Sequence, residues 1–169
     1  LDGDTGKYKR HWGAYGKRPD DSIKFKYDPN KPFEQFSVVH GIGVSNDGLV
    51  YACDRNGSRV HVFKTDGTFV MEKLIEPHTF NGSVFGIAFS PDAEQKWAYI
   101  PDGRNEKLWI LERKSMDIVG SLGCPGHAGG CFTTPHSIDV DAKGNIYLGE
   151  TWEGKRVQRF LYKGLRSES

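Results

Sequence analysis

The chain has 169 residues and a formal net charge of +1 at pH 7, which is the size of one ordinary domain. This balance of charge gives no electrostatic reason to expect a nucleic-acid partner, and no apolar run approaches the roughly 20 residues that cross a bilayer. Hydrophobic residues make up only 37%, but 21 glycines and 12% aromatic residues are typical of many short strands joined by tight turns.

The chain opens with a segment that resembles the outer edge of a β-sheet. Residues 2–6 are rich in aspartate and glycine and predict a turn, and residues 7–12 predict a short outer strand. Residues 14–36 follow with three prolines and no periodicity, which predicts a long loop. Loops of this length usually carry a function or are disordered.

One pattern then occurs three times, over residues 42–63, 87–111 and 138–160. Each copy has an apolar strand, a turn, a second strand, an acidic corner and a third strand that a basic residue opens. The copies begin at intervals of 45 and 51 residues. A period in this range with several strands per unit is typical of a β-propeller. We therefore expect an all-β fold.

The repeat predicts a single partial propeller domain over residues 1–169. We expect a blade remnant at 1–13, the loop at 14–36 and three blades at about 37–75, 84–123 and 134–165. Because such an arc would expose strand edges and blade faces, we expect either the remainder of a longer propeller or a second copy to close the ring. The chain begins with Leu1 rather than Met, so we expect the start of the gene product, with any export signal, to lie upstream.

The three cysteines are too few for a disulfide scaffold. Cys53 lies within a predicted strand, where a buried thiol is expected. Cys124 and Cys131 bracket a glycine-rich loop that would let the two sulfurs meet. A disulfide there would imply an oxidising compartment and an extracytoplasmic or secreted protein. With His127 between them, the pair could instead hold a metal, although the spacing differs from the usual short zinc knuckle.

Two histidines, His40 and His136, occupy equivalent places at the start of the innermost strands. Both would point toward the propeller axis, and two converging imidazoles favour a divalent metal. The middle copy has Phe85 at this place, so the histidines are additions to the repeat. The alternative is that each histidine ties adjacent loops by hydrogen bonds. A third ligand would come from residues outside this chain, or from the loop residues His78 or His127, which we expect to be solvated.

Arg55 follows the second strand of the first predicted blade. Its guanidinium could hold a substrate carboxylate in a bidentate pair, and the alternative is an ion pair with an aspartate between blades. Acidic residues recur at this corner in the later blades, which favours a shared structural role for the acid. Arg104 and Trp152 lie at the same corners and are candidate rim contacts.

At these residues the chain resembles the NHL-repeat propellers, and among them the peptidyl-α-hydroxyglycine α-amidating lyase branch and its bacterial lyase-like relatives. The resemblance rests on segments 36–42, 53–60, 134–138 and 144–147. It implies a six-bladed propeller whose catalytic zinc is held by three histidines, two of which fall on His40 and His136. The family's arginine after the second strand falls on Arg55, which would contact the substrate as a catalytic residue.

The resemblance implies zinc-dependent cleavage of a peptidyl-α-hydroxyglycine, or a related small substrate, to a peptide amide and glyoxylate. The family's calcium-binding aspartate after the last zinc histidine is Ser137 here, and a neutral hydroxyl is a poorer calcium ligand than a carboxylate. The alternative is a non-catalytic propeller that binds a protein, peptide or glycan through its loops, with Trp12, Trp109 or Trp152 as contacts. Trp109 lies within an alternating strand, so core packing is expected for it.

Overall fold

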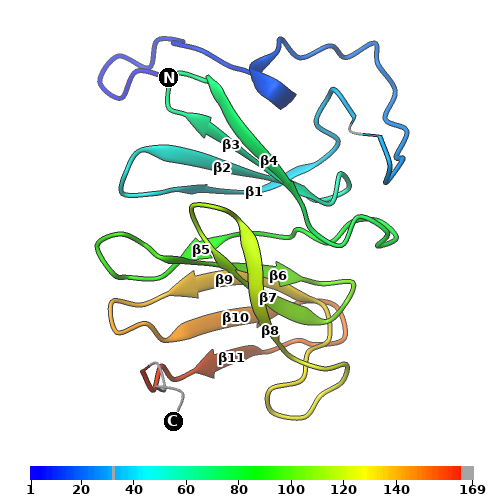
Figure 1. Ribbon diagram of the computed structural model, residues 1–169, viewed down its shortest axis with the longest axis vertical. Coiled ribbons are helices and arrows are strands. Elements are labelled where there is room, and N and C mark those ends of the chain that lie inside the picture. The colour runs from blue at the N-terminus through cyan, green and yellow to red at the C-terminus, as the bar shows by residue number, and fades with distance from the viewer. Residues whose placement is uncertain (32, 165–169) are drawn as a thin grey trace.

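A computed structural model describes residues 1–31 and 33–164 of the chain. Its strands form three antiparallel sheets that follow one another in chain order (Figure 1). This arrangement confirms the all-β fold and the three predicted blades. Pro32 in the predicted loop and Leu165 at the end of the last predicted blade lie outside the described residues. Within the described part of the chain, no helix is long and apolar enough to cross a membrane.

Two sheets have four strands and the third has three, each in a meander. The first sheet contains β1 (Val39–Val44), β2 (Leu49–Asp54), β3 (Arg59–Lys64) and β4 (Phe69–Leu74). The second contains β5 (Ala88–Phe89), β6 (Trp97–Asp102), β7 (Lys107–Glu112) and β8 (Asp117–Leu122). The third contains β9 (Pro135–Val140), β10 (Ile146–Glu150) and β11 (Val157–Phe160).

The apolar faces of neighbouring sheets pack against each other. In the first sheet, Val60 and Val62 alternate toward the second sheet and join a buried cluster with Ile100 and Leu111. A separate cluster between the second and third sheets contains Leu108 and the residues Tyr99, Phe132, Ile146 and Leu148. Period-two alternation thus places one core on each side of the second sheet.

The predicted outer strand at residues 7–12 is not a strand in the structure. A strand needs a neighbouring backbone to pair with, and among the described residues no strand pairs with this segment. Instead, Arg10 Nη1 donates a hydrogen bond of 3.1 Å to the Thr65 carbonyl oxygen, and Trp12 packs on the ring of Phe63 with 5.9 Å between centroids. The segment therefore covers the far face of the first sheet by side-chain contacts.

The predicted loop at 14–36 is anchored at both ends by a buried polar network. A short 3-10 turn, η1 (Ala14–Gly16), places the Tyr15 hydroxyl to donate a 2.6 Å hydrogen bond to Glu72 Oε2. The same carboxylate accepts hydrogen bonds from His61 at 2.6 Å and Arg59 at 2.9 Å. Arg59 also donates to the Gln35 carbonyl oxygen at 2.7 Å. The loop leaves and rejoins the first sheet through these contacts.

The described sheets form an arc with an apolar face at each end. Ile42 and Val44 of β1 are 66% and 61% exposed on the face that turns away from the second sheet. At the other end of the arc, Val157 of β11 is 70% exposed. Such faces are usually covered in folded proteins.

Candidate metal and substrate site at the start of the inner strands

Three equivalent tripeptides, one from each blade, surround a small cavity of about 240 Å³. They are His40-Gly41-Ile42, Phe85-Gly86-Ile87 and His136-Ser137-Ile138. Gly41 allows the close approach, because a Cβ atom there would lie 2.8 Å from Gly86 Cα. The repeat therefore brings the predicted residues His40 and His136 into one site.

The two imidazole rings are in contact, with 4.6 Å between their centroids and an edge-to-face arrangement. His40 Nδ1 lies 2.6 Å from the Phe85 carbonyl oxygen. A carbonyl oxygen can only accept, so Nδ1 carries a proton, and in the neutral tautomer the lone pair is on Nε2. A backbone carbonyl that fixes the tautomer in this way is the usual outer partner of a metal-binding histidine. Sequence reasoning missed this role of Phe85, although the repeat marked its position.

His136 lies within the same contact group. Its ring centroid is 5.4 Å from that of Phe85. Partial burial, followed by the charges of His40 and Arg55, lowers the pKa of His136 below its ordinary value. A lowered pKa favours the neutral imidazole, the form in which histidine binds a metal.

Arg55 stands over the Phe85 ring, with 5.4 Å between the guanidinium carbon and the ring centroid. Its Nε donates a 3.2 Å hydrogen bond to the side chain of Asn56. The alternative role as the partner of Asp54 falls to Arg59, whose Nε lies 3.0 Å from that carboxylate. Arg55 is thus half-buried beside the histidines and has donors available for a ligand.

The donor set fits part of a zinc site. Across residues 1–31 and 33–164, no group of three or more His, Cys, Asp or Glu side chains is arranged to hold a metal ion. His40 and His136, whose rings are in contact, supply at most two ligands, and a catalytic zinc needs three from protein. Ser137 lines the cavity with a neutral hydroxyl, which suits a hard cation such as calcium less well than a carboxylate.

The acidic corners have a structural role in all three sheets. Asp54 Oδ1 accepts hydrogen bonds from the backbone N–H groups of Ser37 and Val38 at 3.1 and 2.9 Å. Asp102 Oδ2 accepts a hydrogen bond from the indole N–H of Trp109 at 2.9 Å and so satisfies this donor, while the ring packs in the apolar core. The third acid, Glu150, pairs with Arg156 at 2.7 Å. The three acidic side chains thus hold the loops at one edge of the sheets, the same edge at which His40 and His136 lie.

Comparisons with known proteins agree with this repeat. The family model described as NHL repeat matches residues 36–63, which span β1 to β3. Residues 36–63 therefore form an NHL repeat, and the three successive sheets have the β-propeller fold.

Three solved structures of enzymes have the same fold as this chain. A virginiamycin B lyase from Staphylococcus aureus is 16% identical, with 74% of this chain and 41% of that chain covered and a TM-score of 0.51. A streptogramin B lyase is 19% identical (75% and 38% covered, TM-score 0.54), and the hydrazine synthase of Kuenenia stuttgartiensis is 17% identical (70% and 32% covered, TM-score 0.55). The chain spans roughly two fifths or less of each. At these identities the likeness shows the fold alone.

The propeller carries a disulfide between Cys124 and Cys131. It closes the loop between the second and third blades, and Arg156 donates hydrogen bonds to the carbonyl oxygens of His127 and Cys131. The alternative metal site at these cysteines is wrong, because their sulfurs are bonded to each other. Cys53 is a buried free thiol, as predicted.

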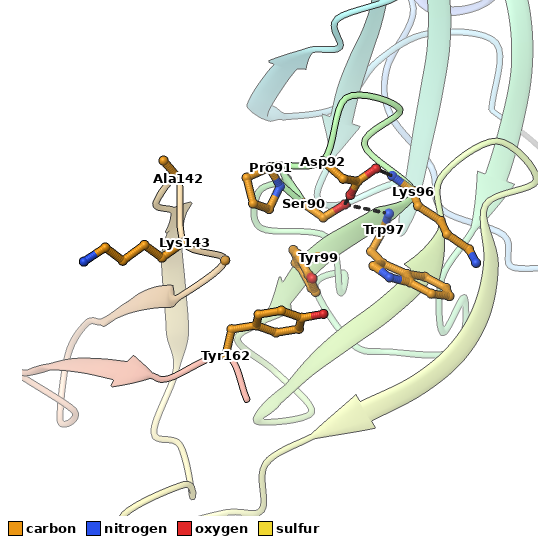
Figure 2. Close-up of a pocket in the computed structure, with 10 residues that line it drawn as sticks. Ser90, Pro91, Asp92, Lys96, Trp97, Tyr99, Ala142, Lys143 and Tyr162 are labelled. Carbon is orange, nitrogen blue, oxygen red and sulfur yellow. Dashed lines mark hydrogen bonds between the residues drawn. The ribbon is translucent and has the colours of Figure 1, made fainter. Parts of the chain in front are cut away.

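A second cavity of about 550 Å³ lies at the opposite edge of the blades, between the turns 90–96 and 141–145. Figure 2 shows the rings of Trp97, Tyr99 and Tyr162 gathered there, with Lys143 extending away from them. Asp92, which also lines this cavity, accepts a hydrogen bond from the backbone N–H of Lys96 at 3.0 Å. The carboxylate therefore stabilises the turn in which it lies. This cavity is larger than the histidine cavity but contains none of the predicted site residues.

Proposed function

We propose that this chain belongs to a lyase-like NHL propeller that holds zinc at His40 and His136 and cleaves a peptidyl-α-hydroxyglycine or a related small substrate at the channel mouth. The observation that carries the proposal is the hydrogen bond from His40 Nδ1 to the Phe85 carbonyl oxygen. It leaves Nε2 free beside the imidazole of His136, as a metal ligand requires.

The remaining zinc ligand is proposed to come from a further part of the ring, supplied by a longer chain or by a second copy. Zinc in such a site would polarise the hydroxyl of the substrate. Arg55 would pair with the substrate carboxylate. The position of its guanidinium over Phe85, a residue of the cavity wall, supports this role. Phe85 and the glycines of the inner segments line the cavity of about 240 Å³, which has room for a substituted glycine.

The reaction balances without a redox partner. The bond between the amide nitrogen and the α-carbon breaks, and its electron pair stays on nitrogen. The hydroxyl loses its proton as its oxygen becomes the aldehyde oxygen of glyoxylate, and the amide nitrogen gains one proton. The cavity is lined by the imidazoles of His40 and His136 and by no carboxylate. Such a lining suits a substrate that carries a negative charge.

The test is metal content and glyoxylate release from the purified protein. We expect zinc by mass spectrometry, a loss of roughly tenfold or more in zinc affinity in His136→Ala, and no loss in His78→Ala, whose side chain lies in an exposed loop. Unchanged zinc in His136→Ala would overturn the metal site. Bound zinc without glyoxylate release would overturn the substrate, and a streptogramin B is then the next compound to test, given the fold of that lyase.

A second candidate function is ligand binding without catalysis. The observation in its favour is Trp152, which is 60% exposed at the rim of the same propeller face. Exposed tryptophans are frequent in binding surfaces for proteins, peptides and glycans. Two results together would favour this candidate. The wild-type protein would contain no zinc, and the double variant His40→Ala with His136→Ala would still bind peptide.

A further inference from the structure

An arginine and a tryptophan from neighbouring blades meet on the rim of the histidine site. Trp152 follows β10 and Arg104 follows β6, at the equivalent corners of the third and second blades. The guanidinium carbon of Arg104 lies 5.2 Å from the centroid of the Trp152 ring. This is a cation–π contact, and it holds the ring at the junction of the two blades.

The backbone holds Trp152 outward in an unfavourable conformation. Its φ is +52°, which is a rare and costly conformation for a bulky residue. The neighbouring Thr151 N–H donates to the Thr134 carbonyl oxygen at 3.1 Å, and Gly154 N–H donates to the Thr151 carbonyl oxygen at 3.0 Å. Tyr15, the other aromatic residue with a positive φ among those described, is held inward by Glu72. Trp152 instead remains exposed.

Gly103 connects this pair to the histidine site. A Cβ atom on Gly103 would lie 2.9 Å from two ring carbons of Phe85 and 2.9 Å from the Pro135 carbonyl oxygen. Phe85 in turn contacts His136 and Arg55. Arg104 therefore follows directly after a residue that contacts the cavity wall at Phe85. Its side chain lies on the rim, over the Trp152 ring.

Charge on this rim is not neutralised by the protein. Among the described residues, the ion pairs include neither Arg55 nor Arg104. Each of these guanidinium groups instead lies over an aromatic ring. The rim thus offers stacking surfaces and positive charge together, a combination that is enriched at binding hot spots.

We propose that the Arg104–Trp152 pair is a subsite for an aromatic side chain in the peptide segment that precedes the α-hydroxyglycine. The proposal rests on the function proposed above. The cavity of about 240 Å³ is below the roughly 300–1,000 Å³ of a typical ligand pocket, and Gly103, next to Arg104, lies against its wall at Phe85. A peptide whose last residue reacts in the cavity would therefore cross the rim beside Arg104 and Trp152.

The expected specificity is a preference for an aromatic residue. An aromatic pair contributes a factor of roughly three to ten in affinity beyond simple burial. We expect kcat/KM for N-acetyl-phenylalanyl-α-hydroxyglycine to exceed that for the alanyl analogue by at least this factor. Trp152→Ala should bring the ratio close to one, and Trp152→Phe should keep most of it. Arg104→Gln should reduce the ratio, whereas Arg18→Gln, in an exposed segment, should leave it unchanged.

A second measurement separates this inference from the proposed reaction. N-acetyl-phenylalanyl-glycine and N-acetyl-alanyl-glycine lack the hydroxyl and cannot be cleaved, so calorimetry measures their binding alone. If neither hydroxyglycine peptide releases glyoxylate but Trp152→Ala removes the aromatic preference in binding, the subsite stands and the reaction fails. If the wild-type protein shows no aromatic preference, or Trp152→Ala and Trp152→Phe both retain it while their melting temperatures match the wild type, the subsite is overturned.

Discussion

The imidazoles of His40 and His136 lie in contact, with 4.6 Å between ring centroids, although they come from the first and third blades. The backbone that allows this contact passes through Gly41, which meets the backbone of Gly86. The distance between the two histidines therefore depends on Gly41, because a side chain at this position would push the two backbones apart.

Gly41→Ala should weaken the histidine site without removing a ligand. The new Cβ would lie 2.8 Å from Gly86 Cα and 3.3 Å from the Phe85 carbonyl oxygen, so one inner strand must shift. We expect a loss of roughly 1–3 kcal/mol in stability and a zinc affinity that falls with it. Chemical unfolding and metal titration measure the two effects. Gly120→Ala is the control, because nothing lies within 4 Å of its Cβ position, and equal effects in both variants would contradict the prediction.

Glu72 should make the first blade sensitive to acid. Burial alone would raise the pKa of Glu72, but hydrogen bonds from His61 and Tyr15 and the charge of Arg59 outweigh it and lower the pKa to about 2. A lowered carboxylate pKa stabilises the folded state above the ordinary value of 4.5, and this stability is lost as the pH falls toward 2.

The comparison is therefore the pH dependence of unfolding in the wild type and in Glu72→Gln. The wild type should lose on the order of 3 kcal/mol more than the variant between pH 5 and pH 2, as measured by urea unfolding at each pH. Parallel profiles for the two proteins would show that Glu72 is not responsible.

Asp54→Ala should be among the most destabilising substitutions in the chain. It removes one of the two carboxylates that pair with the buried guanidinium of Arg59, the one at 3.0 Å, and leaves only Glu72 at 2.9 Å. It also removes the acceptor for the Ser37 and Val38 N–H groups. Breaking a buried ion pair by removing one member costs about 3–5 kcal/mol. A double-mutant cycle with Arg59→Met measures the coupling, and additive effects of the two changes would contradict it.

Reduction of the Cys124–Cys131 disulfide should destabilise the loop before the third blade. The bond closes a short loop, for which chain entropy gives a contribution of about 2 kcal/mol. A reducing agent should therefore lower the midpoint of urea unfolding in the wild type. The double variant Cys124→Ser with Cys131→Ser should start from the lower midpoint and not respond to the reductant, and a response in that variant would point to another target.

The repeat in the sequence was sufficient for the fold class and for the pairing of His40 with His136. Strand alternation and turn residues are local properties, so the three blades could be predicted from them. The repeat also marked Phe85 as the residue that differs between the blades. The acidic corners of Asp54, Asp102 and Glu150 were predictable in the same way, because each lies at the same place in its copy.

Contacts between segments far apart in the chain were decided by the tertiary structure. The hydrogen bond from His40 to the Phe85 carbonyl, the network of Tyr15 with Glu72 and the stacking of Arg104 on Trp152 each join different blades or a loop and a blade. The outer strand predicted at residues 7–12 did not form, because a strand depends on a pairing partner that its own residues do not supply. Local periodicity determined the blades, and packing between them determined which side chains meet.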